Sequence, residues 1–312
     1  MTQIFCGVDV SSQTLDARIG RDGAEARFAA TPEGIEALAA FCREHQVVLA
    51  VMEATGGYEK PAYALLWSHG IPAAIVNPRN VRRFAEAMGF PEKTDRIDAG
   101  IIAWYADAKR IVAQEPASQA QERLKALVTR LRQLTELRTM QSNQRRLVGE
   151  ADINGLFSEM MAMIARQTRE LEAKIAALID ADPLWQKLDE CFRTIKGVAD
   201  RTVSRLMAEM PEIGTLSNKA VAKLAGLAPL AKDSGKSQGK RVTRGGRANL
   251  RNILFVVVEN IRRYNPVFVA LHERLIKAGK AKKVIRVALA RKLLVQLNAK
   301  ARDARKEFAL AA

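Results

Sequence analysis

Short apolar runs alternate with amphipathic segments in the first part of the chain. Ile4–Val10, Leu15–Ile19 and Ala24–Ala29 are brief runs separated by tight turns, which predicts three strands in a meander. From Thr31 to His45 the apolar residues recur at helical spacing behind a threonine that can cap a helix start, so this segment predicts a helix.

The same alternation continues through the next segments. Val47–Met52 is a buried-type strand that ends at Glu53, and the glycine turn Ala54-Thr55-Gly56-Gly57 follows it. One further strand is expected at Ala73–Val76. Three further helices are expected: Tyr58–His69, Asn80–Met88 and one that begins at about Thr94. This order of elements predicts an α/β domain built on a mixed sheet.

Beyond the polar break around Pro116 the pattern becomes helical. Leu124, Leu127, Leu131 and Leu134 are spaced three and four apart, and a second seam of this kind runs from Phe157 to Leu178. The two seams predict a coiled-coil hairpin of two long helices. Its apolar seams favour dimerisation, and the alternative is packing within the monomer.

The rest of the chain predicts further helices around one basic stretch. From Ser234 to Arg251 there are six basic residues and no acids, and glycines are frequent, so a basic loop is expected there. The helices expected after it are Ile253–Ile261, Val267–Lys277 and Lys283–Arg302. We therefore predict three domains: an α/β domain over 1–114, a helical hairpin over 115–185 and a helical, basic domain over 186–312.

Net charge narrows the classes of partner. Lys and Arg number 50 against 34 acids, a formal net charge of +16. A charge this large suits a polyanion, with nucleic acid the first expectation and an anionic membrane surface the second. No apolar run approaches the roughly 20 residues of a membrane span, and the first residues do not resemble a secretion signal. We expect a cytoplasmic protein associated with nucleic acid.

The cysteines and histidines give little support for a metal site or a catalytic site built from them. Cys6, Cys42 and Cys191 are scattered and form no zinc pattern, which fits reduced thiols. The three histidines are equally scattered. A histidine-based triad or metal site is therefore not expected.

Carboxylates are the stronger signal. Asp9 and Glu53 each stand at the carboxyl end of an apolar strand, where ligands gather in such sheets. Asp95 and Asp98 are three apart on an expected helix and so share a face. Four such carboxylates suit Mg²⁺ or Mn²⁺, and two ions about 4 Å apart would serve phosphodiester chemistry. Alternatively, Thr94 caps a helix whose acids only complement its dipole, and Asp9 is a turn acid.

The basic stretch allows two interpretations. A serine there could attack phosphorus if its hydroxyl were deprotonated. The other interpretation, which the pattern by itself favours, is a flexible loop that only binds nucleic acid. In either case its cations suit phosphates, and the candidates for nucleic-acid binding are Lys236, Lys240, Arg241, Arg244, Arg247 and Arg251.

Taken together, these motifs resemble a known family. Gly7-Val8-Asp9-Val10-Ser11, Met52-Glu53-Ala54-Thr55-Gly56-Gly57-Tyr58 and Lys93-Thr94-Asp95-Arg96-Ile97-Asp98-Ala99 are similar to motifs of the DEDD transposases of the IS110 insertion-sequence family, whose relatives include the Piv invertases. Gly226-Leu227-Ala228-Pro229, Ser234-Gly235 and Gly246 with Leu250-Arg251 resemble the second domain of that family. The resemblance spans nearly the whole chain.

The resemblance implies a RuvC-like, RNase H-type fold for the first domain. It implies that Asp9, Glu53, Asp95 and Asp98 form a metal-binding acid tetrad, and that Ser234 is a nucleophile forming a transient DNA–serine bond, with Ser237 as the second choice. It further implies a bridge RNA that selects donor and target DNA, and homodimers or tetramers in which the serine of one subunit completes a site on another.

The leading hypothesis is therefore a site-specific DNA recombinase or transposase. One alternative is a RuvC-like junction nuclease in which water is the nucleophile. Another is a non-catalytic nucleic-acid-binding protein. A sugar-kinase-like phosphotransferase fits less well, because the second half lacks the expected glycine-rich nucleotide pocket and the charge suits a small substrate badly.

Overall fold

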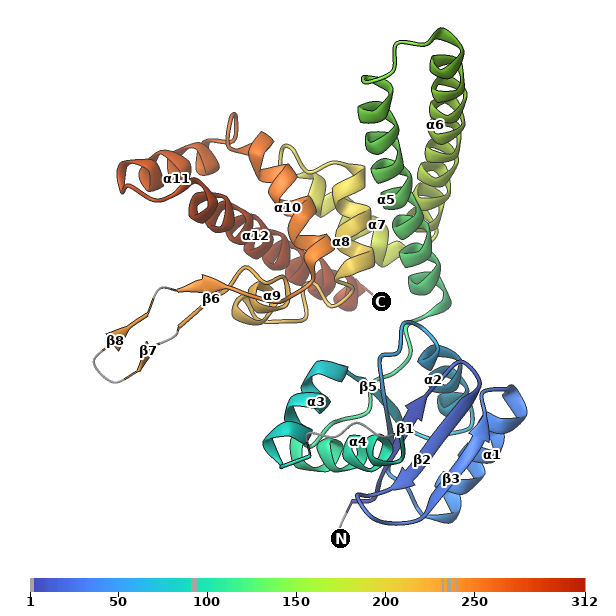
Figure 1. Ribbon diagram of the computed structural model, residues 1–312. Helices are drawn as coiled ribbons and strands as arrows, with labels where there is room; N and C mark the ends of the chain where they lie inside the picture. The colour runs from blue at the N-terminus through green and yellow to red at the C-terminus, as the bar shows by residue number, and fades with distance from the viewer. Residues whose placement is uncertain (1–2, 91–94, 232, 235–236, 240, 312) are drawn as a thin grey trace. The chain divides into compact units, whose positions relative to one another are not determined.

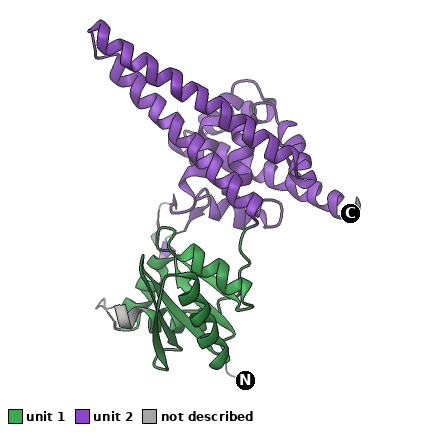
Figure 2. Ribbon diagram, turned by 90° about the vertical axis from the view of Figure 1, so that its right-hand side faces the viewer, with its two compact units in different colours: residues 1–117 green, residues 118–312 purple. Residues whose placement is uncertain are grey.

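The computed structural model describes residues 3–90, 95–231, 233–234, 237–239 and 241–311, and the side chains of all of these except 95–98, 234, 237–238 and 311. The chain forms two compact units, residues 1–117 and residues 118–312 (Figure 2). No helix in the described part is long and apolar enough to cross a membrane.

Unit 1 is built on one five-stranded mixed sheet in the order β3-β2-β1-β4-β5 (Figure 1). β1, β2 and β3 form an antiparallel meander, and β4 and β5 add to β1 in parallel. The predicted mixed α/β architecture is confirmed. The strands are β1 Phe5–Val10, β2 Thr14–Ile19, β3 Glu25–Ala29, β4 Leu49–Glu53 and β5 Ala73–Val76.

Helices cover both faces of this sheet. α1 (Pro32–Glu44) and α2 (Glu59–Ser68) pack on the face that carries Cys6, Val8 and Val10 of β1. α3 (Pro78–Ala87) and α4 (Asp95–Lys109) pack on the opposite face, against Phe5, Leu49 and Val51. Because side chains alternate along a strand, the odd-numbered residues of β1 and β4 face α3 and α4.

Gly7 allows α4 to approach β1 closely. A Cβ atom at Gly7 would overlap the carbonyl oxygen of Ala99 and crowd the amide nitrogen of Ala103. The helix therefore lies against bare strand backbone at this point. It is fixed further by Arg21, whose guanidinium carbon lies 4.4 Å from the ring centre of Trp104.

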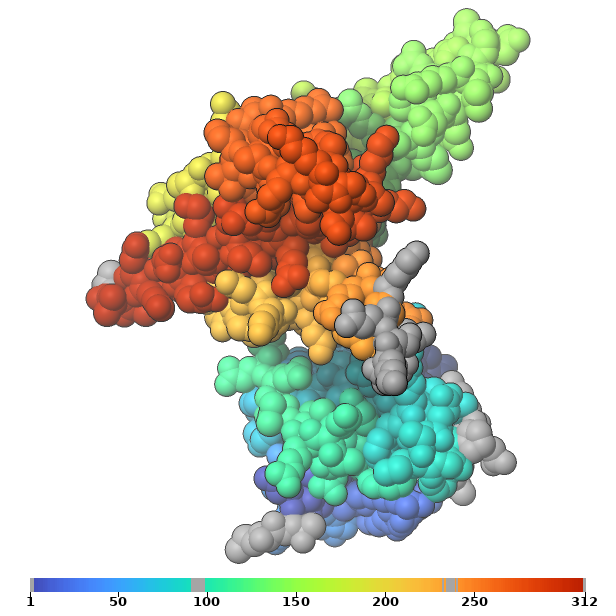
Figure 3. Space-filling model, turned by 90° about the vertical axis from the view of Figure 1, so that its left-hand side faces the viewer, coloured from blue at the N-terminus to red at the C-terminus, as the bar shows by residue number. Residues whose placement is uncertain are grey.

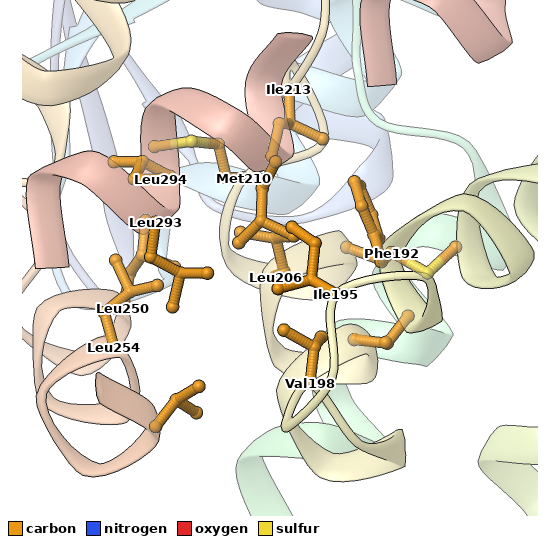
Figure 4. Close-up of a cluster of buried hydrophobic side chains, with 14 of the residues drawn as sticks. Phe192, Ile195, Val198, Leu206, Met210, Ile213, Leu250, Leu254, Leu293 and Leu294 are labelled. Atoms are coloured by element: carbon orange, nitrogen blue, oxygen red, sulfur yellow. The ribbon is translucent and has the colours of Figure 1, made fainter. Parts of the chain in front are cut away.

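Unit 2 is mainly helical. Its core gathers side chains from helices far apart in the sequence, among them Phe192, Leu206, Leu254 and Leu293 (Figure 4). The last helix extends beyond the predicted end at residue 302. The helices are α5 Gln119–Arg145, α6 Ala151–Asp180, α7 Pro183–Arg193, α8 Asp200–Glu209, α9 Asn218–Leu224, α10 Ala248–Ile261, α11 Pro266–Lys277 and α12 Lys282–Ala311.

α5 and α6 form the predicted hairpin, which extends from the helical core (Figure 1). Near the core its seam is buried at Leu131 and Ile175. Toward the tip, other apolar residues of α6 beside this seam are exposed, and Leu156 is 65% exposed. The exposed apolar residues of α6 recur three and four apart: Ile153, Leu156, Met160 and Met163. We call these four residues the hairpin stripe.

A projecting ribbon takes the place of the predicted basic loop (Figure 1). At its base β6 (Pro229–Leu230) pairs with β9 (Val242–Thr243), and farther out β7 (Asp233–Ser234) pairs with β8 (Ser237–Gln238). Each strand has two residues, so no apolar alternation in the sequence could reveal it. We call β6 to β9 the ribbon.

Candidate active site

Four charged side chains line up across the sheet of unit 1. Arg27 of β3 is opposite Asp16 of β2, and Asp16 is opposite Asp9 of β1. On the other side of β1, Val8 pairs with Met52 in parallel register, so the next residues, Asp9 and Glu53, are neighbours. Adjacent strands lie about 4.8 Å apart. We call Arg27, Asp16, Asp9 and Glu53 the charged row.

The charged row faces α4. Asp9 follows Gly7, and Glu53 follows Val51, by two residues, so both acids lie on the face that α3 and α4 cover. Both are half-buried, and each takes part in interactions within the chain. The expectation that the two acids occupy equivalent strand ends agrees with this register.

α4 lies beside the same part of the sheet at Ala99, in its second turn. Ala99 helps line a pocket of about 360 Å³ together with Asp16, Arg18 and Arg27. Positions 95 and 98 precede Ala99 in this helix, position 95 by one turn. The side chains of Asp95 and Asp98 lie outside the described residues.

Asp16 and Arg27 were not among the predicted site residues. The Arg27 Nε donates to the Asp16 Oδ1 at 2.6 Å, and the Asp16 side chain is only 20% exposed. A sequence signal existed: a hairpin turning at Ser12-Gln13 pairs Asp9 with Asp16. Asp16 thus adds a third carboxylate to Asp9 and Glu53, and the Arg27 guanidinium neutralises the charge of Asp16.

Glu59 also escaped prediction, and it holds the turn that follows Glu53. This buried carboxylate accepts hydrogen bonds from the amides of Thr55, at 2.9 Å, and Gly57, at 2.8 Å. Gly56 and Gly57 have positive φ angles of 69° and 116°, which glycine adopts at no steric cost. Glu59 thus fixes the backbone at the end of the strand that carries Glu53.

The described residues, the charged row included, show no arranged metal site. Among them, no group of three or more His, Cys, Asp or Glu side chains is arranged to hold a metal ion. That search does not include Asp95 and Asp98. Cys6 and Cys42 are buried on the sheet face away from α4, where a hydrogen bond with Cys42 and burial raise the pKa of the Cys6 thiol.

Ser234 belongs to the ribbon of unit 2. Its backbone pairs with that of Ser237 in the outer part of the ribbon, and the side chains of both serines lie outside the described residues. The neighbouring Asp233 accepts a hydrogen bond from Arg241 at 3.3 Å. The two candidate serines are thus opposite each other on a short two-stranded segment.

The predicted nucleic-acid-binding cations fall into three groups. Arg241 and Arg244 are exposed on or beside β9. Arg251 instead donates to the carbonyl oxygens of Gly245, at 2.7 Å, and Ala225, and Arg247 donates to the carbonyl oxygen of Glu209 and pairs with Glu212. Lys236 and Lys240 lie outside the described residues.

Arg251 works together with two glycines at the base of the ribbon. A Cβ atom at Gly226 would overlap the carbonyl oxygen of Gly245, and one at Gly246 would overlap the amide nitrogen of Gly226. Gly226 and Gly246 have positive φ angles of 68° and 75°. The two chain segments at the ribbon base therefore meet backbone to backbone, with the Arg251 guanidinium beside them.

Comparisons with known proteins cover both units. A family model for the DEDD transposases of IS110, described as "Transposase", matches residues 6–148, and the model "Transposase IS116/IS110/IS902 family" matches residues 189–273. The chain is 28% identical over 310 residues to the pilin gene-inverting proteins of Moraxella bovis and Moraxella lacunata, covering 94% of each chain. It is 31% identical over 145 residues, 46% of this chain and 35% of the other, to the insertion element IS110 uncharacterized 43.6 kDa protein of Streptomyces coelicolor.

Proposed function

The chain belongs to the IS110 family of transposases, and on that premise we propose that it cuts and rejoins DNA at specific sites through a metal-bound acid tetrad and a serine nucleophile. The proposed tetrad is Asp9, Glu53, Asp95 and Asp98, in a RuvC-like unit 1. The proposed nucleophile is Ser234 of the ribbon, with Ser237 as the second choice. The observation that carries the proposal is the adjacency of Asp9 and Glu53 on neighbouring parallel strands.

The donors in unit 1 fit a divalent ion. Asp9 and Glu53 are half-buried carboxylates on strands about 4.8 Å apart, and like charges this close are favourable only near a cation. Their hard oxygen atoms suit Mg²⁺ or Mn²⁺. Asp95 and Asp98 begin the helix that packs on Gly7, two residues before Asp9. When bound, the ion would polarise the scissile phosphate and favour the serine alkoxide.

The chain's own groups have distinct parts in this reaction. The Ser234 Oγ loses its proton and attacks phosphorus, so a P–O bond to serine forms as the bond to the 3′ oxygen breaks. The departing 3′ oxygen takes a proton. Rejoining reverses these changes when a 3′-hydroxyl of another strand attacks the DNA–serine bond. Exposed Arg241 and Arg244 are suited to hold the neighbouring phosphates.

The proposal extends to partners. Donor and target DNA are the substrates, and a bridge RNA encoded by the element selects them. The net charge of +16 is suited to binding both nucleic acids. Copies of the chain assemble as dimers and tetramers through a coiled coil, for which the exposed hairpin stripe is the best candidate. The protein acts at the bacterial nucleoid.

A covalent-adduct assay tests the chemistry. DNA carrying the element ends, labelled at the 3′ end of the cleaved strand, is incubated with the full chain, element-encoded RNA and Mg²⁺, and resolved on a denaturing protein gel. Wild type should retain label on the protein. Ser234→Ala should retain none while still binding DNA, and Asp9→Ala should lower adduct formation by about 10³-fold or more.

Ser237→Ala is the matched control, because Ser237 lies opposite Ser234 in the same short segment. Ser237→Ala should form the adduct within about threefold of the wild-type level. A change of this size is far smaller than the loss expected when a nucleophile is removed. Label retained by Ser234→Ala and lost by Ser237→Ala would assign the nucleophile to the second serine. Adducts formed equally well by both variants would rule out either serine.

A water-using junction nuclease is a second candidate. The observation that favours it is that the charged row lies entirely within unit 1, so metal binding needs nothing from the ribbon. In that case Ser234→Ala would cut branched DNA as wild type does, Asp9→Ala would not, and neither would leave labelled protein.

A further inference from the structure

Unit 2 has a groove between the base of the ribbon and the last two helices. Its volume is about 700 Å³. Leu227, Pro229 and Val242 at the ribbon base form one side, and α11 and α12 form the other. Figure 3 views unit 2 from the side on which the ribbon and α11, both in orange, project. We call this cavity the ribbon groove.

The floor of the ribbon groove is apolar. Leu271 and Leu275 of α11 and Val284 and Val287 of α12 contribute to it. Val284 is 52% exposed and Val242 is 54% exposed. Single exposed valines are ordinary on a protein surface, but a continuous apolar floor in a cavity marks a binding site.

The rim of the ribbon groove is cationic. Five of the residues that line it are basic, and none of the described lining residues is acidic. Arg241 directly precedes β9, and Arg274 belongs to α11. The other three cations belong to α12: Lys283, Arg291 and Lys292. Arg241 belongs to the basic stretch of the ribbon itself, so the groove continues the surface already proposed to bind phosphates.

A neighbouring basic pocket has a carboxylate among its lining residues. The cavity between α10, α11 and α12 also contains Lys283, but Glu259 accepts hydrogen bonds there from Arg262 and Arg286, each at 2.7 Å. Burial would raise the pKa of Glu259, yet these two hydrogen bonds outweigh burial and hold that pKa below its usual range. Two of its cations are thus engaged by a carboxylate that lines the same pocket. In the ribbon groove no described lining residue is acidic, and Arg241 pairs with Asp233, which does not line the groove.

We propose that the ribbon groove binds an unpaired nucleic-acid strand, with bases on the apolar floor and phosphates at the cationic rim. A duplex hides its base faces inside the stack and presents mainly sugars and phosphates, so it would leave the floor unused. An unpaired strand exposes both its base faces and its phosphates, and therefore matches both parts of the groove.

This inference rests on the proposed function in one respect: exchanging strands between DNA molecules requires that some nucleotides be unpaired. Its test is nevertheless separate. Equilibrium binding needs neither metal nor cleavage, so loss of the covalent adduct and loss of single-strand binding are independent results.

The test is fluorescence anisotropy with the full chain and a fluorescein-labelled oligothymidylate of about 12 nucleotides, within the usual site size for such grooves. A hairpin duplex of similar length is the second probe. Val284→Asp places a negative charge on the floor at an exposed position. Val256→Asp is the matched control, because Val256 is 62% exposed on α10 and does not line the groove.

Val284→Asp should weaken binding of the unpaired probe by about 10-fold and of the duplex by less than about 2-fold, because a carboxylate on the floor removes apolar contact that only unpaired bases make. Val256→Asp should change neither. Lys283→Gln, which leaves the apolar floor intact, should weaken binding of the unpaired probe and lower its salt dependence, with Lys277→Gln as the control outside the groove.

Three results would overturn the proposal. One is unchanged single-strand affinity in both Val284→Asp and Lys283→Gln. A second is equal weakening for the two probes, which would make the groove a phosphate site only. The third is loss of self-association with unchanged nucleic-acid binding, which would make it a protein interface. Circular dichroism melts confirm that each variant is folded. If Val284→Asp does not fold, the result for Lys283→Gln decides the test.

Discussion

At the scale of single residues, Gly7 controls how closely α4 approaches the strand that carries Asp9. The helix lies against the backbone of Gly7 at Ala99 and Ala103. A glycine is the only residue that leaves this space empty, so the distance between the helix start and the strand end depends on one missing methyl group.

Gly7→Ala should therefore push α4 away from β1. Overpacking of this kind, against backbone atoms that cannot rotate away, should lower the free energy of unfolding by about 3 kcal/mol. The measurement is urea denaturation followed by circular dichroism. A change below about 0.5 kcal/mol, the usual size for a surface substitution, would contradict the close packing.

Gly155→Ala is the control for this substitution. Gly155 lies in α6, and a Cβ atom there would meet nothing within 4 Å. Because alanine is the better helix former, the same methyl group should stabilise the protein there by about 0.5–1 kcal/mol. The opposite signs at the two glycines would show that contact, and not glycine chemistry in general, decides the result.

Residues with long-range partners were beyond prediction from the sequence. The positions of Asp9 and Glu53 at strand ends were predictable, because an acid that ends an apolar strand is conspicuous. Arg251 was not, since its role depends on carbonyl oxygens of Gly245 and Ala225 that only the fold brings to it. Glu59 was missed for a different reason: its partners are local, but nothing in the neighbouring sequence distinguishes a turn-holding acid from an ordinary acid at the start of a helix.

At the scale of elements, periodicity predicted the long segments and missed the short ones. All five strands of unit 1 and the α5–α6 hairpin were predicted, because each has enough residues to show a period. The ribbon was interpreted as a loop, because pairs of two residues have no period. The start of α10 at Ala248 was also placed too late, since Asn249, Arg251 and Asn252 interrupt the apolar run there.

The hairpin stripe leads to a prediction at this scale. Ile153, Leu156, Met160 and Met163 have the spacing of a coiled-coil seam and are exposed in a single chain. A double substitution, Leu156→Glu with Met160→Glu, should convert the proposed dimers to monomers in analytical ultracentrifugation. The dissociation constant should rise about 100-fold or more, as loss of about 3 kcal/mol implies.

Ser158→Glu is the control for the stripe, because Ser158 is exposed on the side of α6 away from Leu156 and Met160. It should leave the dissociation constant unchanged. Dimers that persist in the double variant would mean that copies associate through another surface, and the hairpin would then be a packing element only.

At the scale of the whole molecule, the excess of positive charge predicts strong salt dependence. With 50 basic and 34 acidic residues, binding to DNA should release many counterions. Affinity for a duplex should fall by about 10³-fold between roughly 50 and 200 mM salt. Anisotropy titrations across that range measure the slope.

An oligonucleotide with an uncharged backbone is the control, because it has no counterions to release. Its affinity should be low and nearly independent of salt. A duplex affinity that changes by less than about 3-fold over the same range would show that base contacts, and not phosphates, dominate binding.

The edges of the unit 1 sheet have a consequence for how copies of this chain can aggregate. β3 carries Glu25 and Arg27 along its edge, tied to Arg18 and Asp16 of β2, and β5 is only four residues long, with the carbonyl oxygen of Ala73 accepting a hydrogen bond from Gln114. Charged or very short border strands are poor templates for adding a foreign strand. High local concentrations should therefore not drive these sheets to fuse into fibrils, and the proposed association of copies is left to helical surfaces, whose contacts can dissociate again.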